Sequence, residues 1–227
     1  MQYTYHFLTL IKDLLFPIFC LGCKKEGTWL CDDCKPTVDC SGLFLCSDCD
    51  HPSLSSHAAM MKYEEHGISG GLIRAWKYNN SQEVGQILRF YLAKFIAKEA
   101  SWFFRADFVV PVPLHRRRYA ERGFNQAELL AKDIAKIFDW PCIPALKRTC
   151  FTSQQARLNR EAREKNVKNS FQVTTSFPAG ASVLLVDDVY TTGVTLQECA
   201  RVLRRAGVKE VHGFTLARGI SNTVRNS

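Results

Sequence analysis

The sequence of 227 residues lacks an apolar stretch long enough to cross a membrane, which takes about 20 consecutive apolar residues. Its most apolar region, YHFLTLIKDLLFPIFC, has no Lys or Arg before it and is interrupted by Lys12 and Asp13, so it does not have the pattern of a secretory signal peptide. Apolar residues recur at helical spacing between residues 7 and 15, and Pro17 ends this pattern. We therefore expect a short amphipathic helix here and a cytosolic protein.

The sequence also has no internal repeat, no low-complexity tract and no GxxxxGK sequence followed by Ser or Thr. These absences exclude a repeat protein and a P-loop nucleotide hydrolase. Acidic residues are few, with 22 Asp and Glu against 30 Lys and Arg, which gives a net charge of +8. The segment from Arg105 to Lys168 holds 14 basic and 7 acidic residues, so most of the excess lies in the middle of the chain. This distribution indicates a phosphate-bearing or otherwise anionic partner.

Cysteines, in contrast, are concentrated near the amino terminus. Seven of the ten lie between residues 20 and 49, mostly in CxxC pairs. A CxxC turn presents two thiolates to one tetrahedral ion, and two such turns complete a four-cysteine zinc site. The alternative is a disulfide framework, but a cytosolic protein keeps its thiols reduced. We predict a structural zinc site, because a segment of roughly 30 residues cannot build a sufficient core. The favoured ligands are Cys20, Cys23, Cys31 and Cys34.

The spacing alone leaves the choice of zinc ligands open. Cys46 and Cys49 could replace one of the two favoured pairs, or could form a second site with Cys40 and His51. The favoured pairs are separated by seven residues and predict a compact zinc knuckle, whereas a site that includes the third pair would be a longer ribbon.

From residue 68 onward, helical and strand patterns alternate. The helical segments are 70–80, 83–100, 125–138 and 196–206, and the strands are 106–114, 182–189 and 210–218. Such alternation predicts a parallel sheet flanked by helices, with binding sites at the carboxyl ends of the strands. We expect two parts, a cysteine module with its amphipathic helix in residues 1–55 and an α/β domain in residues 56–227.

The stretch VLLVDDVYTTGVTL, residues 183–196, joins four aliphatic residues to Asp187 and Asp188 and then to a threonine-rich loop. A continuous aliphatic run is typical of a central parallel strand, so the two acids lie where ligands bind. There they could accept hydrogen bonds from vicinal sugar hydroxyls, directly or through hydrated Mg2+. The loop offers backbone N–H groups and hydroxyls to an anion, and Gly193 permits a tight turn around a phosphate. Together they predict a site for a phosphorylated ribose, whereas the alternative is that the acids only cap a helix.

This stretch resembles the phosphoribosyl pyrophosphate (PRPP) signature of the type I phosphoribosyltransferases. Two further segments, residues 109–131 and 148–171, look like hallmark segments of the ComF/GntX family of competence proteins. In that family a cysteine-rich zinc module precedes a phosphoribosyltransferase domain, and the order here is the same. The resemblance covers nearly the whole chain. It implies an α/β, type I phosphoribosyltransferase-like parallel sheet flanked by helices, with a small four-cysteine zinc module before it.

By this resemblance, the stretch 183–196 would bind PRPP. Asp187 and Asp188 would hold the ribose hydroxyls and Mg2+, and would be the catalytic residues if transfer occurs. The 5'-phosphate would be bound by Thr191, Thr192, Gly193 and Thr195.

Basic residues elsewhere would complete the site. The pyrophosphate would lie against the residues after the strand 106–114, whose guanidinium groups match phosphate oxygens in pairs. These candidates are His115, Arg116 and Arg117, with Lys77 as a weaker one. A hood over the acceptor would include Arg148, Thr152 and Gln155. The alternative for the pyrophosphate candidates is a solvated basic face with no bound ligand. The alternative for the hood candidates is an ordinary surface loop.

One position departs from the purine-salvage members of the superfamily. They place an aspartate two positions before the glycine, where it can serve as a base toward the purine, but this sequence has Thr191 there. The resemblance therefore disfavours a hypoxanthine-type reaction and identifies no acceptor.

Two functions stay open. The first is a competence protein that handles incoming single-stranded DNA in the cytosol beside other competence or recombination proteins, with PRPP and Mg2+ as ligands. Arginines interleaved with aromatic residues between 116 and 124 could bind a phosphate backbone and stack bases. The candidates for DNA contact are Arg116, Arg117, Arg118 and Arg122. The second function is a salvage phosphoribosyltransferase that joins PRPP to a small nitrogenous acceptor.

Overall fold

The computed structural model describes residues 17–46, 52–78, 81–100, 106–150 and 167–219. The amphipathic helix expected between residues 7 and 15 lies outside these residues. The described chain forms two compact units, one containing residues 17–39 and 64–88 and the other residues 40–63 and 89–219.

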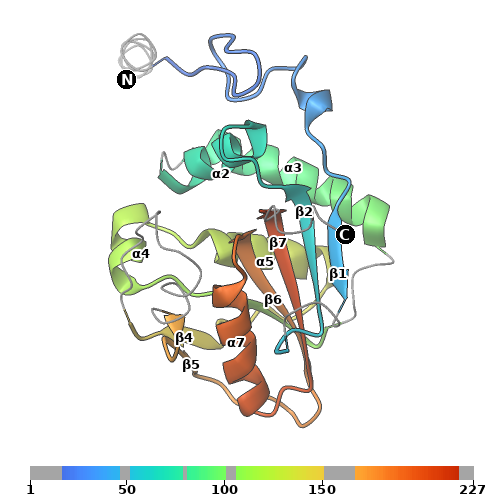
Figure 1. The fold of residues 1–227 in the computed structure, drawn as a ribbon, viewed down its shortest axis with the longest axis vertical. Helices are drawn as coiled ribbons and strands as arrows, with labels where there is room; N and C mark the ends of the chain where they lie inside the picture. The colour runs from blue at the N-terminus through green and yellow to red at the C-terminus, as the bar shows by residue number, and fades with distance from the viewer. Residues whose placement is uncertain (1–16, 47–51, 79–80, 101–105, 151–166, 220–227) are drawn as a thin grey trace, which may run out of the picture. The chain divides into compact units, whose positions relative to one another are not determined.

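A five-stranded sheet forms the centre of the second unit (Figure 1). Its order is β1-β2-β7-β6-β3, with the central strands paired in parallel and β1 antiparallel to β2. Strand β6 lies between β7 and β3, and residues 183–186 are all buried, as expected of a continuous aliphatic run. The strands are β1 (Leu43–Cys46), β2 (Ser56–Lys62), β3 (Phe108–Pro111), β6 (Ser182–Tyr190) and β7 (Glu210–Arg218).

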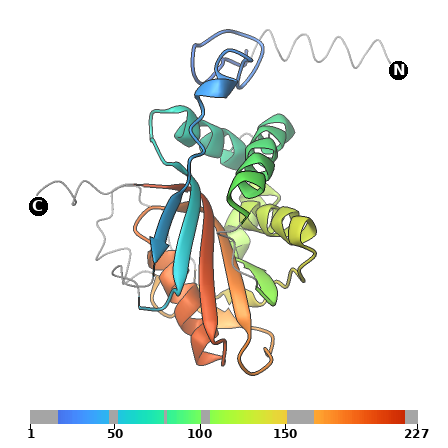
Figure 2. The same ribbon diagram turned by 90° about the vertical axis from the view of Figure 1, so that its right-hand side faces the viewer.

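Helices α5 (Gln126–Phe138) and α7 (Val194–Arg205) cover opposite faces of this sheet (Figures 1 and 2). Asn125 caps the start of helix α5, and its side-chain oxygen accepts the N–H of Ala127 at 3.1 Å. Helix α7 buries the stripe that its periodicity predicts, and the chain leaves it at Gly207, which has a positive φ of 94°. The buried stripe consists of Leu196, Cys199, Ala200 and Leu203.

Two elements in the basic middle of the chain complete the second unit. Helix α4 (Arg116–Arg122) follows β3, and strands β4 (Leu146–Arg148) and β5 (Phe171–Val173) form a separate antiparallel pair. The sequence patterns do not predict the β4–β5 pair, because three-residue strands are too short to show alternation.

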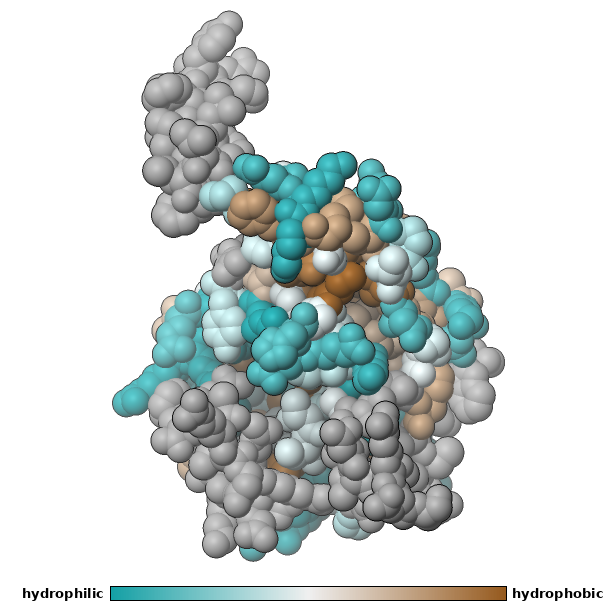
Figure 3. Space-filling model, turned by 45° about the horizontal axis from the view of Figure 1, so that its top comes forward, coloured by the Kyte–Doolittle hydropathy of each residue, from teal (hydrophilic) through white to brown (hydrophobic). Residues whose placement is uncertain are grey.

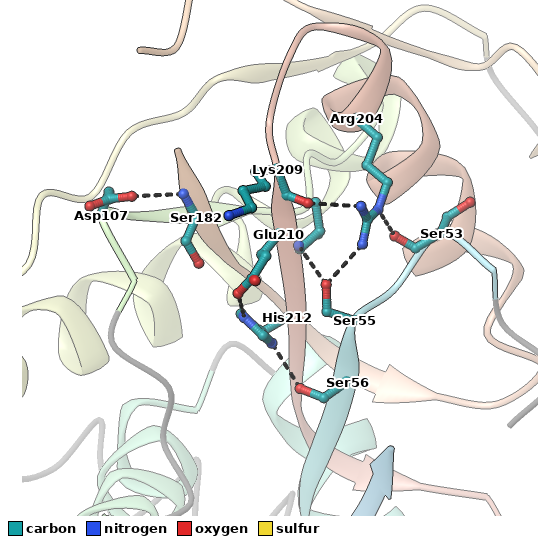
Figure 4. A network of polar contacts seen from close by, with 10 residues as sticks. Ser53, Ser55, Ser56, Asp107, Ser182, Arg204, Lys209, Glu210 and His212 are labelled. Carbon is teal, nitrogen blue, oxygen red and sulfur yellow. Dashed lines mark hydrogen bonds and ion pairs between the residues drawn. The ribbon is translucent and has the colours of Figure 1, made fainter. Parts of the chain in front are cut away.

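A polar network lies at the end of the sheet where strands β2 and β7 begin (Figure 4). The Arg204 guanidinium donates to the backbone oxygens of Ser53 and Lys209 at 2.7 and 2.8 Å and to Ser55 Oγ at 2.8 Å. His212 Nδ1 lies 2.9 Å from Ser56 Oγ. These contacts tie the end of α7 to the beginnings of β2 and β7, so the aspartates near the carboxyl end of β6 lie at the opposite edge.

The first unit contains the short 3-10 helix η1 (Lys35–Thr37), helix α2 (Ile68–Tyr78) and the first part of α3 (Gln82–Glu99). The rest of α3 belongs to the second unit. The domain boundary expected after residue 55 stays a prediction. Strand β1, which lies on the amino-terminal side of that boundary, pairs with β2 and is part of the sheet.

Candidate functional site

The two aspartates lie near the carboxyl end of β6, as the sequence predicts for a central strand. Asp188 is 9% exposed, and Asp187 is partly exposed. The Asp187 side chain accepts the N–H of Asp188 at 2.8 Å, which orients its carboxylate. Because β6 is flanked on both sides by parallel strands, the acids stand at the sheet edge where open α/β sheets bind ligands.

A small hollow continues directly from Asp187 to the start of α7. Gly193 adopts φ 75°, in the left-handed region that favours glycine, and the chain then enters the helix. The Gly193 carbonyl accepts the N–H of Gln197 at 2.9 Å, so the preceding N–H groups of the first turn have no acceptor within the helix. Such a loop can bind an anion through these N–H groups and its hydroxyls. The hollow is lined by Asp187, by residues 189–190 and by residues 191–196.

His115 and the arginines of α4 form a concentrated positive charge. His115 caps α4, and its Nδ1 accepts the N–H of Arg117 at 3.2 Å. Desolvation lowers the pKa of His115, and the positive charges of Arg148 and of Arg116 to Arg118 lower it further. The imidazole is therefore biased toward its neutral form while surrounded by cations. An anion placed here would relieve that repulsion.

Arg148 lies within electrostatic range of both Arg118 and Asp187. It lies on β4, with its guanidinium 5.3 Å from the centroid of the Phe171 ring on β5. Burial lowers the pKa of Arg148, the charge of Arg118 lowers it further, and attraction to Asp187 opposes this change. The structure thus brings His115, Arg118, Arg148 and Asp187 within electrostatic range, although they come from separate segments.

The other sequence-predicted residues lie elsewhere or outside the described residues. Arg122, at the end of α4, donates to Gln126 Oε1 at 3.3 Å. Lys77 is in the last turn of α2, in the other compact unit, and its role stays a prediction. Thr152 and Gln155 lie outside the described residues.

The four favoured cysteines gather into one cluster, in which all Sγ atoms lie within 4.8 Å of one another. Cys31 Sγ is 3.6 Å from Cys20 Sγ and 3.5 Å from Cys23 Sγ. A tetrahedral zinc ion with Zn–S bonds of about 2.3 Å holds its sulfurs about 3.8 Å apart. The side chains of Cys20, Cys23, Cys31 and Cys34 therefore fit a closed four-sulfur metal site.

Backbone geometry prepares this cluster. The Lys24 N–H donates to the Cys20 carbonyl at 3.0 Å, and the Cys31 N–H points to Cys20 Sγ at 3.4 Å. Burial would raise the pKa of Cys20, but N–H donors from Cys31, Cys23 and Gly22 lower it to about 6. Gly22 is needed for close approach, because a Cβ there would lie 2.6 Å from Cys34 Sγ.

The alternative ligands are not part of this cluster as described. Cys40 is partly exposed and is not a member of the four-sulfur group. The side chain of Cys46 and all of Cys49 and His51 lie outside what the structure describes, so their metal binding stays a prediction.

Tyr190 is a residue of the site to which the sequence patterns assign no role. It lines the hollow and is 3% exposed. Its only sequence signal is its place between Asp188 and the threonine loop, because an aromatic residue at the end of a strand is ordinarily part of the core.

Hydrophilic side chains cover much of the described surface in Figure 3, with a smaller apolar area among them. Within the described ranges, no helix has the length and apolar character needed to span a bilayer.

Comparison with known proteins shows that the chain is similar to a domain family, to named proteins and to a solved structure. Residues 125–227 match the phosphoribosyl transferase domain family. The chain is 33% identical over 209 residues to competence protein F of Haemophilus influenzae, covering 88% of this chain and 90% of that protein. It is 34% identical to the DNA utilization protein YhgH of Escherichia coli (strain K12), covering 90% of this chain and 99% of that protein. The glutamine PRPP amidotransferase structure from B. subtilis aligns with 63% of this chain and 30% of its own, at 22% identity and a TM-score of 0.42.

Proposed function

Because the chain belongs to the ComF/GntX family of competence proteins, we propose that it binds PRPP with Mg2+ and handles incoming single-stranded DNA in the cytosol. One observation carries the ligand assignment. Two carboxylates near the end of a central parallel strand continue directly into a hollow lined by a threonine-glycine loop at a helix start. Carboxylates suit ribose hydroxyls and Mg2+, and the loop suits a phosphate ester.

Each part of the ligand has a candidate partner. Asp187 and Asp188 take the ribose hydroxyls and Mg2+, and the loop 191–195 takes the 5'-phosphate. His115 with Arg116 and Arg117 takes the pyrophosphate, whose negative charge offsets the repulsion among these cations. Arg148 feels the charges of both Arg118 and Asp187, and we infer that it contacts the same anion. Mg2+ would neutralise charge on the pyrophosphate oxygens.

If the protein turns PRPP over, a nitrogen of the acceptor forms a bond to C1 of the ribose as the C1–pyrophosphate bond breaks. The bonding electron pair leaves with pyrophosphate, and the acceptor nitrogen loses its proton to solvent or to a base. Asp187 and Asp188 would orient the sugar, while His115 and the arginines would stabilise the departing anion. This is the alternative enzymatic function, a salvage phosphoribosyltransferase.

Calorimetry with Mg2+ and PRPP tests the ligand assignment. The wild-type protein is expected to bind, and a double variant with Asp187→Asn and Asp188→Asn is expected to lose affinity by about tenfold or more. Asp133→Asn is the matched control, because Asp133 pairs with Arg89 on the surface between α3 and α5. Equal PRPP affinity for the wild type and the double variant would contradict the ribose assignment.

The DNA assignment has a separate test in the salt dependence of single-stranded DNA binding. Neutralising Arg116, Arg117 and Arg118 with Gln is expected to weaken binding and to reduce the slope of log affinity against log salt by about 0.7 for each phosphate that the protein no longer neutralises. Arg205→Gln is the control, because Arg205 is exposed in the last turn of α7. An unchanged slope would restrict the three arginines to pyrophosphate.

A deletion strain distinguishes the two functions. The competence function predicts loss of transformation by external DNA with no nutritional requirement. A purine or pyrimidine requirement together with unchanged transformation would support the salvage enzyme, as would pyrophosphate release from PRPP with a small nitrogenous acceptor.

We also propose that the cysteine cluster holds a structural zinc ion. A closed set of four sulfurs leaves no open coordination position for catalysis, and metal binding would supply folding energy to this small segment. One equivalent of zinc is expected in the purified wild-type protein, and Cys31→Ser is expected to release it. Retention of the zinc in Cys31→Ser, with its loss only on changing Cys46 and Cys49, would overturn this ligand set.

A further inference from the structure

Tyr190 lies against the loop that forms the hollow. A Cβ placed on Gly193 would overlap the Tyr190 hydroxyl and would also lie within 3.0 Å of its Cε2 atom. The far end of the tyrosine ring therefore occupies the space beside the Gly193 backbone. Gly193 is required for this contact as well as for its positive φ of 75°.

Residues of two other strands also contact the Tyr190 ring. Its ring centroid lies 4.3 Å from that of His57 on β2, and the Arg218 guanidinium lies 5.4 Å from the ring centroid. The Tyr190 carbonyl accepts the N–H of Gly219 at 2.8 Å, which holds the backbone at the end of β6. The ring is thus held between His57, Arg218 and the loop.

His57 is itself held in place. It is 3% exposed, and its Nε2 lies 3.1 Å from Oγ1 of Thr215, which is fully buried. Gly213 makes room for it, because a Cβ on Gly213 would lie 3.0 Å from His57 Cδ2. A continuous series of packed groups therefore runs from the interior of the sheet through His57 and Tyr190 to Gly193. Close-packed interiors transmit small displacements, so the position of Gly193 depends on this series.

We propose that Tyr190 is a positioning residue that supports the loop 191–195 at Gly193 and so sets the loop N–H groups for a phosphomonoester. This inference rests on the proposed function of that loop as the 5'-phosphate site. Two of the three atoms nearest to the Gly193 Cβ position are ring carbons, which a phenylalanine at position 190 would keep. A binding group displaced by about 1 Å loses much of its contribution to affinity. Support of the loop by Tyr190 should therefore affect how tightly the loop binds a phosphomonoester.

The test compares Tyr190→Leu with Tyr190→Phe in the full chain, using ribose 5-phosphate and inorganic pyrophosphate as separate probes with Mg2+. Leu cannot reach Gly193, so Tyr190→Leu is expected to weaken ribose 5-phosphate binding by about tenfold or more. Tyr190→Phe keeps the ring and is expected to stay within about threefold of the wild type. Pyrophosphate affinity is expected to be unchanged in both variants, because its candidate partners lie on α4 and at His115. A purely structural role would lower the affinity for both probes.

Phe108→Leu is the matched control, because Phe108 is a partly buried aromatic residue at the start of β3 that packs against Phe177 at 5.6 Å between ring centroids. It is expected to lower stability and leave ribose 5-phosphate affinity unchanged. If the wild type binds ribose 5-phosphate and Tyr190→Leu binds it equally well, the positioning role is overturned while the proposed function stands. If the wild type binds neither PRPP nor ribose 5-phosphate, the proposed function and this inference both fail.

A second measurement covers the case in which Tyr190→Leu does not fold. In wild-type protein with 13C-labelled tyrosine, the Tyr190 ring signals are assigned by their absence in Tyr190→Phe. They are expected to shift on titration with ribose 5-phosphate and to remain unchanged with pyrophosphate. Absence of a shift at saturating ribose 5-phosphate would overturn the proposal.

Discussion

Replacing Glu198 with Ala should destabilise the fold well beyond a surface substitution. Glu198 is 8% exposed on α7, and its carboxylate accepts two bonds from Arg201, at 2.6 and 2.7 Å, and the Asn169 N–H at 2.7 Å. These bonds fasten α7, which begins at the loop of the hollow, to the residues just before β5. Burial alone would raise the pKa of Glu198, but the bonds from Arg201 and Asn169 lower it overall.

The size of the effect follows from what Glu198→Ala leaves behind. Removing one member of a buried ion pair typically costs about 3–5 kcal/mol, because the other charge stays buried without compensation. The Arg201 side chain is 27% exposed, so water can solvate part of its charge and reduce this cost. The Asn169 N–H also loses its acceptor, but Asn169 is exposed, so water can replace the carboxylate oxygen and the added cost is small. We therefore expect Glu198→Ala to lower the free energy of unfolding by about 2–4 kcal/mol at pH 7.

Urea unfolding followed by circular dichroism measures this change. The matched control is Glu128→Ala, since Glu128 forms an exposed i,i+4 pair with Lys132 at 2.7 Å and should change the free energy of unfolding by about 0.5 kcal/mol or less. Because the folded-state pKa of Glu198 is lowered, its contribution is present above the ordinary carboxyl pKa of 4.5 and is lost as pH falls through the lower folded value. A Glu198→Ala effect no larger than that of Glu128→Ala at pH 7, or one that grows below pH 4.5, would refute this reasoning.

Three further predictions concern other parts of the chain. Gly22→Ala should reduce the zinc content measured by mass spectrometry, because its Cβ would lie 2.6 Å from Cys34 Sγ; a full equivalent of zinc would contradict the cluster geometry. The lowered pKa of His115 should rise when pyrophosphate binds, so affinity measured by calorimetry should increase as pH falls, and this increase should be smaller in His115→Asn. Burial lowers the pKa of His212 in the folded protein. The stability that neutral His212 permits is therefore present above its ordinary pKa of 6.5 and is lost as pH falls through the folded-state pKa. Thermal melts should show less of this loss in His212→Asn, and a melting temperature with the same pH dependence as in the wild type would contradict the prediction.

Several elements of the fold could be predicted because their signals are local. The aliphatic run 183–186 and the stripe on α7 each depend on residues within one element. In contrast, β2 consists of SHAAMMK, which shows no regular alternation because His57 and residues 59–61 are all buried between neighbouring strands. Its role depends on pairing with β7, about 150 residues later in the chain.

Some residues of the candidate site could likewise be predicted from local sequence, and others could not. The sequence by itself determined which acids, which threonine-glycine loop and which paired cysteines are the candidates, because the members of each group lie close together in the chain. Only the tertiary structure placed Arg148 near Asp187, set Tyr190 against Gly193 and joined Glu198 to Asn169. These contacts link segments that are distant in sequence or depend on how a ring packs, and no local pattern encodes them. They form only when the chain folds, because folding packs distant segments together and each buried polar or aromatic group then needs a partner.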